Sequence, residues 1–551
     1  MPFVRFRRPA RPGRRSFIAG ALALAAAGLA GCRQSGSSST SQATTTSGPA
    51  AAGTIPPPAR SGPTDATAVM AISRNLVNGE QDPFFMHTSL LCHEPLIALD
   101  DGLAPTPALA ERWSLSEDGL SWTFSLRKGV TFSDGQPFNA QAVVTTVERN
   151  IRISPRTSSF FTLDAKAAYG PLAEVRALDD ATVEFRHTTP YPVMEATMTN
   201  FFSAIYSPAS FANDGTFKTI PGTTGPFRLV DWQTDQYALL ERNDTHWGSK
   251  PPLRQIRLRV IPDPNTRVSA LVAGEVDAVV ELGALLPVQA AQLKSRDDIV
   301  VGADPISITQ FLTFNCGRPP FNDMRLRLAV VRTFDRETVV RELVLGFGEP
   351  GKSLLSPFSK RWFSPKGTPA FDPAEGQALA QAALGGQRVE VTLPFSAPTG
   401  QARPYKEIAE YLQAALKPLG LDVKLQQLEA AALTDVTNRG DWHLRMSQNG
   451  WANGDADFLL SSWVASTGGI NTTNKGAYKN EEADRLIAQG RTERDQQKRY
   501  AIYERVQEIV ATEVPSIAMY HERAPFAHRT TLTGLRQRVT YQPTLESVRR
   551  T

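Results

Sequence analysis

The sequence predicts an α/β fold, and three observations support this prediction. Short segments in which apolar and polar residues alternate, as in half-buried strands, recur along the chain. Segments with helical periodicity, several of them behind a residue that can cap a helix, lie between these strands. The composition, with 41% hydrophobic and 21% charged residues among 551, is that of a globular protein with several domains.

The predicted strands and helices alternate from the first third of the chain to its end, as is typical of α/β lobes. Strands are predicted at 122–127, 256–260, 276–280, 388–393 and 421–428, and helices at 265–274, 404–416 and 482–511, with further helix starts at Asn139, Asp323 and Asp335. Residues 226–242 are predicted to form a hairpin. In this hairpin we expect cross-strand contacts between two apolar pairs, Phe227 and Leu229 against Tyr237 and Leu239.

Residues 1–31 have the organisation of an export signal. Six arginines and no acidic residue lie in this segment, and the apolar stretch 17–30 carries no charge. At about 14 residues this stretch is shorter than the ~20 that span a bilayer, which favours a cleaved signal peptide. Arg14-Arg15-Ser16-Phe17-Ile18 resembles a twin-arginine signal, and Leu29-Ala30-Gly31-Cys32 resembles a lipobox. We therefore expect a lipoprotein anchored to the membrane through Cys32, with an incidental thiol as the alternative.

Residues 32–66 are predicted to be a disordered tether. They consist almost entirely of Ser, Thr, Gly, Ala, Pro and Gln, which cannot bury enough apolar surface to fold. The globular body is therefore expected in the periplasm or at the cell surface, held by its lipid anchor. Loss of the six signal arginines would change the net charge from +4 to −2, so the charge of the whole chain does not indicate a nucleic-acid partner.

One segment, 346–353, matches a phosphate-binding loop but lacks its context. Gly346-Phe347-Gly348-Glu349-Pro350-Gly351-Lys352-Ser353 fits the pattern G-x-x-x-x-G-K-S. That motif needs a strand before it and a helix behind it, so that backbone N–H groups point at phosphate. Here a helical pattern precedes the segment, and Pro357 cuts short any following helix. We therefore predict a glycine-rich turn after a helix, not a nucleotide site.

No other motif predicts enzyme chemistry, and the chain is not predicted to be an enzyme. His93-Glu94 and His521-Glu522 lack the second histidine of a zincin, and no G-x-S-x-G nucleophile elbow occurs. The seven histidines are scattered in sequence, so neither a metal site nor a cofactor is predicted. Cys92 and Cys316 either form a disulfide or remain buried thiols, because sequence alone does not place them within bonding distance.

Several blocks of sequence together carry a resemblance to a known family. They include Trp122-Thr-Phe-Ser-Leu-Arg-Lys-Gly-Val-Thr-Phe-Ser-Asp-Gly, Gly222-Thr-Thr-Gly-Pro-Phe-Arg, Glu241-Arg-Asn-Asp-Thr-His-Trp, Ile261-Pro-Asp-Pro-Asn-Thr-Arg and, later, Gly450-Trp451. In this order they resemble the solute-binding proteins of bacterial peptide and nickel ABC importers. The likeness extends from about residue 69 to about residue 520, which is nearly the whole body.

This resemblance implies a two-lobed, periplasmic-binding-protein-like α/β fold that encloses a ligand between its lobes. The lobes are joined by a hinge of two chain crossings, expected near 308–312 and 508–520. The implied division is lobe I at 67–310 and 513–551, with an extra subdomain at about 105–220, and lobe II at 311–512. Closure by hinge motion would expose a surface for the permease subunits of an ABC importer. The expected protein is a monomer that binds a small solute.

The resemblance also implies four candidate ligand-binding residues. Arg156 and Trp451 match by position a pocket arginine and a pocket tryptophan of nickel-binding members, which hold an anionic metal chelate. A solvated loop arginine and a core tryptophan are the respective alternatives. The other pocket positions of those members fall near Phe201, Gln81, Gly454, Thr467 and Gly468, and their residue types are not kept.

Asp455, or alternatively Asp457, matches the aspartate with which peptide-binding members meet a peptide α-amino group. An arginine and an aspartate facing each other would select a zwitterion, such as a short peptide, an opine or a chelate with a free amine. The sequence therefore favours an extracytoplasmic protein that binds short peptides, with a nickel-chelate or metallophore binder as the alternative.

Overall fold

The computed structural model describes residues 66–551 except 75–91, 158–161, 219, 397–402 and 451–452. These residues belong to the compact unit formed by 57–551. The predicted export signal and residues 32–65 of the predicted tether, Cys32 included, lie outside the described residues, as do Gln81 and Trp451. Ala66, which was predicted to end the disordered tether, is instead fully buried in a core. Among the helices that the structure describes, none is both long and apolar enough to cross a membrane.

The largest sheet is mixed and has nine strands within the described part of the chain. Its order is β10 (Phe227–Gln233), β11 (Tyr237–Arg242), β12 (Gln255–Val260), β1 (Thr67–Ile72), β13 (Ala278–Val279), β19 (Ser516–Arg529), β14 (Ile299–Phe314) and β18 (Leu444–Gly450), and β15 (Gly348–Pro350) pairs with β19. β1 runs parallel to both β12 and β13, whereas β19 is antiparallel to β13, β14 and β15.

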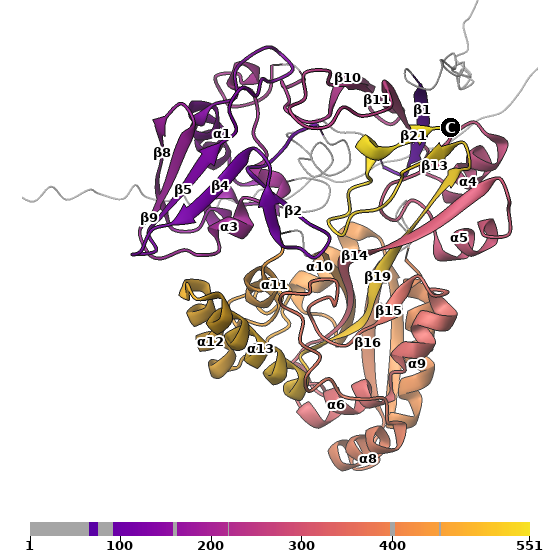
Figure 1. Ribbon diagram of the computed structural model, residues 1–551. Coiled ribbons are helices and arrows are strands. Elements are labelled where there is room, and N and C mark those ends of the chain that lie inside the picture. Colours follow the sequence, from indigo (N-terminus) through magenta and orange to yellow (C-terminus); the bar gives the residue numbers. More distant parts are fainter. Residues whose placement is uncertain (1–65, 75–91, 158–161, 219, 397–402, 451–452) are drawn as a thin grey trace, which may run out of the picture. The chain divides into compact units, whose positions relative to one another are not determined.

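The long strands β14 and β19 pair side by side and contribute to different cores at their two ends (Figure 1). At one end, Ile299 and Ala527 pack in a cluster with residues of α4 (Pro264–Ala273) and α5 (Pro287–Leu293). At the other end, Leu312, Phe314 and Ile517 pack with residues of α6 (Met324–Thr333) and α9 (Tyr405–Leu416). The register of the pair shifts between Pro305 and Thr309. The two strands therefore link two separately packed regions.

A second sheet, of four antiparallel strands, has a core of its own. Its order is β4 (Ala110–Leu115), β5 (Ser121–Leu126), β9 (Thr182–His187) and β8 (Leu172–Asp179), and α1 (Ala140–Arg152) contacts β8 and β9. Phe124 and Phe185 of the sheet are fully buried together with Val143 of the helix. The predicted cap is confirmed, because the Asn139 side chain accepts a hydrogen bond from the backbone of Ala142 at 3.0 Å.

The remaining elements complete these regions. The strands are β2 (Ile97–Leu99), β3 (Pro105–Pro107), β6 (Arg156–Thr157), β7 (Thr162–Leu163), β16 (Val389–Ser396), β17 (Leu421–Leu428), β20 (Leu532–Thr533) and β21 (Arg549–Arg550). The helices are α2 (Ala165–Ala168), α3 (Met194–Thr197), α7 (Arg336–Thr338), α8 (Pro373–Leu384), α10 (Ala430–Arg439), α11 (Ala456–Trp463), α12 (Glu481–Thr492) and α13 (Gln496–Glu513). The parallel pair β16–β17, with α9 between its strands, confirms the elements predicted for 388–428.

Two local predictions need correction. The predicted helix at 482–511 is two helices, because Asp495 caps the start of α13 by accepting hydrogen bonds from the backbones of Gln497 and Lys498. The predicted hairpin at 226–242 exists, but its cross-strand pairs differ from those expected. Leu229 lies opposite Leu240, and a register shift between Leu229 and Asp231 displaces the pairs that follow. A bulge places an extra residue on one strand, so the side chains beyond it face different partners from those that regular alternation predicts.

Directly after β15 the chain passes very close to β19 at Gly351, the third glycine of the phosphate-loop-like segment. The backbone N–H of Gly351 donates to the carbonyl of Met519 at 3.1 Å. A Cβ atom on residue 351 would lie 2.0 Å from the backbone oxygen of Ala518, a distance at which atoms overlap. Glycine is therefore required here by close approach of two backbones.

We expect Gly351→Ala to destabilise the protein by roughly 1–3 kcal/mol, because β15 and β19 must separate to admit the methyl group. Thermal unfolding followed by circular dichroism would show a lower midpoint. Gly469→Ala is the matched control, because nothing lies within 4 Å of a Cβ atom at that position. Equal midpoints for the two variants would contradict the steric explanation.

Candidate functional site

A polar cluster lies where β14, β18 and β19 meet the start of α9. We call it the strand-face cluster, and it consists of Gln310, Arg403, Tyr405, Gln448 and Glu522. Arg403 donates two hydrogen bonds to Glu522, from Nε to Oε1 at 2.9 Å and from Nη2 to Oε2 at 3.1 Å. Gln310 donates from Nε2 to Glu522 Oε1 at 2.5 Å and to Gln448 Oε1 at 2.9 Å. The Tyr405 hydroxyl donates to Gln310 Oε1 at 2.7 Å.

The strand-face cluster is buried but charged. The Arg403 and Glu522 side chains are each 9% exposed. Burial alone would lower the pKa of Arg403, but the Glu522 carboxylate outweighs this effect and holds that pKa above its usual range. Burial raises the pKa of the Tyr405 hydroxyl, which therefore remains a neutral donor. The arrangement thus offers a forked guanidinium, a carboxylate and amide groups, a set suited to recognising charged or polar small molecules.

A second acid–base pair lies at the ends of the parallel strands β1 and β13. Glu281 accepts hydrogen bonds at Oε2 from the backbone N–H of Ser73 at 2.7 Å and from the Ser73 hydroxyl at 2.9 Å. Its other oxygen, Oε1, forms an ion pair with Arg74. Ser73 directly follows β1 and Glu281 follows β13, so the pair lies at the carboxyl ends of parallel strands. Ligands of open α/β sheets bind outside these ends.

An apolar cluster joins the two charged pairs. Leu282, which follows Glu281, packs with Ile306 and Ile308 of β14, Ala524 of β19 and the buried Tyr541. The Glu522 carboxylate is close enough to contribute to raising the pKa of Tyr541, after the larger effect of burial. Residues that follow β13 and residues near the middle of β19 line a small pocket together with parts of the proposed lobe II. The lining includes Leu282, Gly283, Leu285, Val344, Phe347, Arg403, Tyr520 and Glu522. Arg403 and Glu522 therefore line this pocket themselves, whereas the Glu281 pair is next to it in sequence through Leu282 and Gly283.

Asp455 and Asp457 are brought together at the start of α11, and each binds an arginine of the same region. Asp455 caps α11 and accepts two hydrogen bonds from Arg499, at 2.8 and 2.9 Å. Asp457 contacts Arg491 at 3.3 Å and accepts a hydrogen bond from the Tyr503 hydroxyl at 3.1 Å. Burial raises the pKa of Asp457. The structure thus gives both carboxylates internal partners, and their binding of a ligand amino group stays a prediction.

The other candidate residues cannot be placed at a site. The backbone of Arg156 lies in β6, opposite Leu163, but its side chain is outside what the structure describes. Trp451 and Cys32 lie outside the described residues altogether. The strand-face cluster and the Glu281 pair were missed by sequence reasoning. The only available signal was the presence of charged residues inside or directly after apolar strands, as at Glu522 and Glu281.

No group of three or more metal-ligating side chains is found within the described part of the chain. His521, on β19, is fully buried with Nδ1 2.8 Å from the Thr309 hydroxyl oxygen, and burial lowers its pKa to about 3. Cys92 and Cys316 are not bonded to each other, and burial raises their pKa values to about 12 and about 11. The structure therefore has Cys92 and Cys316 as free thiols shielded from solvent and not as a disulfide.

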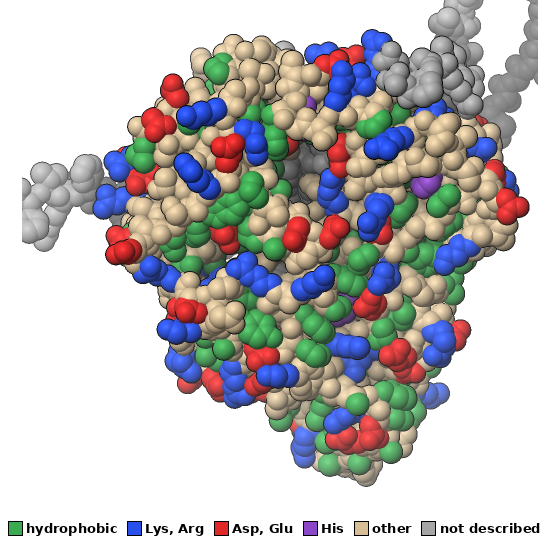
Figure 2. All heavy atoms as spheres, in the orientation of Figure 1, with side chains coloured by type: hydrophobic (Ala, Val, Ile, Leu, Met, Phe, Trp, Pro, Cys, Tyr) green, Lys and Arg blue, Asp and Glu red, His purple; other side chains and the backbone are tan. Residues whose placement is uncertain are grey.

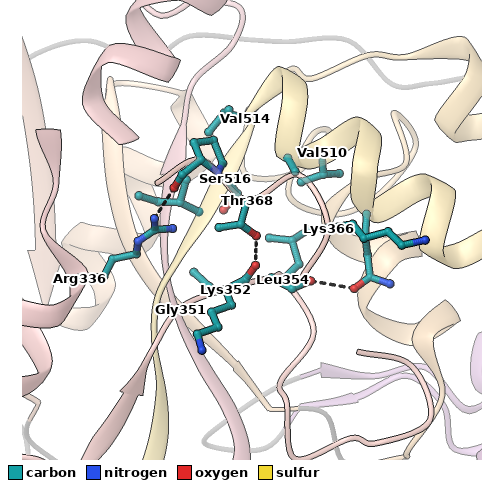
Figure 3. Close-up of a pocket in the computed structure, with 15 residues that line it drawn as sticks. Arg336, Gly351, Lys352, Leu354, Lys366, Thr368, Val510, Val514 and Ser516 are labelled. Carbon is teal, nitrogen blue, oxygen red and sulfur yellow. Dashed lines mark hydrogen bonds between the residues drawn. The ribbon is translucent and has the colours of Figure 1, made fainter. Parts of the chain in front are cut away.

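The phosphate-loop-like segment has the wrong structure for phosphate binding, as predicted. Residues 348–350 form β15, and no helix begins at Ser353. A small pocket is lined by Gly351, Lys352 and Ser353 among others, and polar groups there have internal partners: the Thr368 hydroxyl donates to the Lys352 carbonyl and the Ser353 hydroxyl donates to Gln507 Oε1 at 2.7 Å. Figure 3 shows the Lys352 side chain directed away from this pocket.

On the face shown in Figure 2, acidic and basic side chains are interspersed and form no continuous basic patch.

Comparison with protein families identifies the chain. The family described as bacterial extracellular solute-binding proteins, family 5, middle, matches residues 104–471. The chain belongs to this family. Its members are the substrate-binding components of ABC transporters; they work outside the cytoplasm with permease subunits and are not enzymes, as predicted from the sequence.

Individual relatives agree with this assignment. The glutathione-binding protein GsiB of Salmonella choleraesuis (strain SC-B67) is 26% identical over 453 residues, which cover 80% of this chain and 85% of that protein. NikA from Brucella suis, in complex with Fe(III)-EDTA, matches with a TM-score of 0.78 and 23% identity over 88% of this chain and all of its own. A dipeptide-binding protein from Pseudoalteromonas sp. SM9913, in complex with Met-Leu, matches with a TM-score of 0.72 and 22% identity over the same shares. These likenesses confirm the two-lobed fold of a periplasmic solute-binding protein.

We expect Asp455→Asn to destabilise the solute-binding protein by about 3–5 kcal/mol, because Arg499 would remain as a buried charge without its carboxylate. Thermal or urea unfolding measures this change. Asp441→Asn is the control, because Asp441 pairs with Arg439 at an exposed site where such pairs add little stability. If Asp455→Asn were as stable as the control, the Asp455–Arg499 ion pair would not contribute to the stability of the fold.

Stability should fall in acid partly because of His521. Its folded pKa of about 3 lies below the ordinary value of 6.5, so the unfolded chain takes up a proton first as the pH falls. The folded state is therefore fully favoured above pH 6.5 and loses stability between pH 6.5 and about 3. Between pH 7.5 and 4.5 we expect urea unfolding to show a loss of up to roughly 3 kcal/mol from this group, and a smaller loss in His521→Asn. Identical pH profiles would contradict this assignment.

Proposed function

We propose that this chain is a lipoprotein that captures a small zwitterionic or anionic solute, preferably a short peptide, and delivers it to an ABC importer. The observation that carries the proposal is the buried acid–base contact Arg403–Glu522 next to the register shift of β14 and β19, together with a second such contact, Arg74–Glu281, at the carboxyl ends of β1 and β13. A solute with a carboxylate and an ammonium group can exchange partners with such pairs without leaving a buried charge uncompensated.

The proposed hinge lies within β14 and at the start of β19. We assign 67–310 and 513–551 to lobe I, with the four-stranded sheet within its subdomain at about 105–220, and 311–512 to lobe II. Two features support crossings at 308–312 and 508–520. The register of β14 and β19 shifts next to Thr309 and again at Gln310, and separately packed cores lie on either side of that level. Interrupted pairing is where two packed bodies can bend relative to each other.

A short peptide fits the charges at this site. Arg403 can bind a carboxylate with two parallel hydrogen bonds, and Glu522 or Glu281 can accept from an ammonium group. Arg156, Trp451, Asp455 and Asp457 remain proposed ligand residues from the family resemblance. The relative GsiB is named for binding glutathione, and the Pseudoalteromonas relative holds Met-Leu. Both of these ligands are short peptides with free amino and carboxyl groups.

A metal chelate is the second candidate, supported by the likeness to NikA with bound Fe(III)-EDTA. The described residues hold no cluster that could bind a bare metal ion. A metal would therefore enter as a complete chelate, held through its carboxylates by arginine and aromatic side chains. Export by the twin-arginine route, lipidation at Cys32 and a monomeric body complete the proposal. Mass spectrometry of the mature N-terminus tests the lipidation directly.

The proposal predicts a selective thermal shift for the full exported chain carrying Cys32→Ser. Reduced glutathione, Met-Leu and other di- to pentapeptides should raise the unfolding midpoint, because a ligand at 100 times its Kd adds about 2.7 kcal/mol. Ni(II) with histidine, and Fe(III)-EDTA, are the competing probes. A shift with chelates alone would replace the peptide proposal by the chelate proposal, and no shift with any probe would contradict both.

Arg403 is tested by charge removal. Arg403→Gln should abolish the peptide-induced shift, whereas Arg388→Gln, which removes an exposed partner of Asp422, should leave it intact. Because Arg403→Gln leaves Glu522 buried and unpaired, the double variant with Glu522→Gln serves as the folded reference. If the double variant still bound the peptide, Arg403 and Glu522 would not be part of the ligand site.

A further inference from the structure

The hairpin β2–β3 inserts its tip into a core built by a distant part of the chain. Leu103, in the turn between the two strands, is fully buried although its backbone φ of 62° is one that non-glycine residues rarely adopt. It packs in a cluster that contains Trp362, Ala456 and Leu460. The hairpin lies in the proposed lobe I, whereas these three partners lie in the proposed lobe II. Leu103 is therefore a contact between regions that the proposed hinge would move apart.

The same hairpin touches the turn that leads into α11. A Cβ atom on Gly454 would lie 2.7 Å from the carbonyl oxygen of Leu103 and 3.2 Å from Leu99 Cδ2. Gly454 also has a φ of +67°, so both space and backbone conformation favour glycine at this position. The turn and the hairpin tip are thus in direct contact, with no room for a side chain between them.

The turn at 453–455 is held by hydrogen bonds from both regions. From the proposed lobe I, the hydroxyl of Thr199, which follows α3, donates to the carbonyl of Asn453 at 3.2 Å. From the other side, Trp362 Nε1 donates to the carbonyl of Gly454 at 2.8 Å. Asp455 is then fixed by Arg499. One face of this short turn therefore keeps its partners, Thr199 and the hairpin tip, only while the two regions stay docked.

Further polar contacts join the same two regions. Arg494, between α12 and α13, donates to the carbonyl of Glu117, and Arg361 Nη1 lies 4.0 Å from Glu195 Oε2. Lys360 and Arg361 also line an open pocket together with Asp100 and Asp101 of the hairpin turn. The basic side chains come from one region and the acidic ones from the other, which favours docking in this orientation.

We propose that Leu103 is a positioning residue for solute binding: its docking against Gly454 holds the 453–455 turn and the start of α11 in the closed arrangement. This inference rests on the proposed function, since it assumes that a solute is bound when the lobes are closed. Opening of the lobes would expose the Leu103 side chain and break its contact with the 453–455 turn. Docking of Leu103 therefore makes the closed arrangement more stable relative to the open one. A solute that binds only the closed form then dissociates more slowly while Leu103 is docked.

Amide hydrogen exchange of the unliganded protein tests the positioning role without any ligand. In Leu103→Ser we expect faster exchange at 453–463, with unchanged exchange in β5 and in the 312–314 part of β14. Leu103→Met should behave as the wild type because it keeps an apolar side chain of similar size. Leu178→Ser is the matched control, because Leu178 is an exposed leucine of the same region. Unchanged exchange at 453–463, or an equal increase everywhere, would overturn the proposal.

A second variant and a binding measurement complete the test. Gly454→Ala pushes the hairpin away from the opposite side and should give the same local increase in exchange as Leu103→Ser. With glutathione or Met-Leu as the probe, Leu103→Ser should bind about 10-fold more weakly, mainly through faster dissociation. Unchanged dissociation of a probe that binds the wild type would overturn the role in solute binding. Failure of both probes to bind the wild type would count against the proposed function, while the exchange result would still decide the positioning of the turn.

Discussion

The pairing of β14 with β19 is the interaction on which the rest of the structure depends. These strands are paired from Ile299–Arg529 to Thr313–Ser516, and their two ends enter different cores. Backbone hydrogen bonds join the strands along this length and connect the two packed regions, and the pairing is interrupted only at the level where the register shifts, where the hinge is proposed. The strand-face cluster lies at this level, since Gln310 and Glu522 project from the two strands next to the shift. Bending there would change the distances within the cluster directly.

The charged groups described above are arranged in pairs rather than left open. Arg403 with Glu522, Arg74 with Glu281, and Asp455 with Arg499 are all neutral as pairs. Burying a single charge is costly, so a site that must exist both empty and filled is more stable when its charges have partners in the empty state. At the proposed site such pairing would also limit affinity, because a solute would have to replace an existing contact. This is appropriate for a carrier that has to release its cargo to a permease.

Local features could be predicted from the sequence, and contacts between distant residues could not. The caps at Asn139 and Asp335 were predictable because a cap depends on residues a few positions away. The break at Asp495 was missed because the helical pattern continues across it, and the hairpin pairs were missed because a bulge leaves no clear signal in the sequence. Arg403 and Glu522 are 119 positions apart, so only the fold shows that they meet. Asp455 remains a predicted ligand residue, and its partner Arg499 could not be predicted because it lies 44 positions away on another helix.

The position of β19 in the sheet has a consequence for how this protein is made. β19 comes from residues 516–529, near the end of the chain, yet it pairs with β13, β14 and β15 in the interior of the largest sheet. During synthesis, neither packed region can complete its sheet until almost the whole chain has left the ribosome. Folding must then bring together strands that are hundreds of residues apart, which is intrinsically slow. A secretion machinery that accepts finished, folded cargo would let this step occur in the cytoplasm, where chaperones and ATP are available.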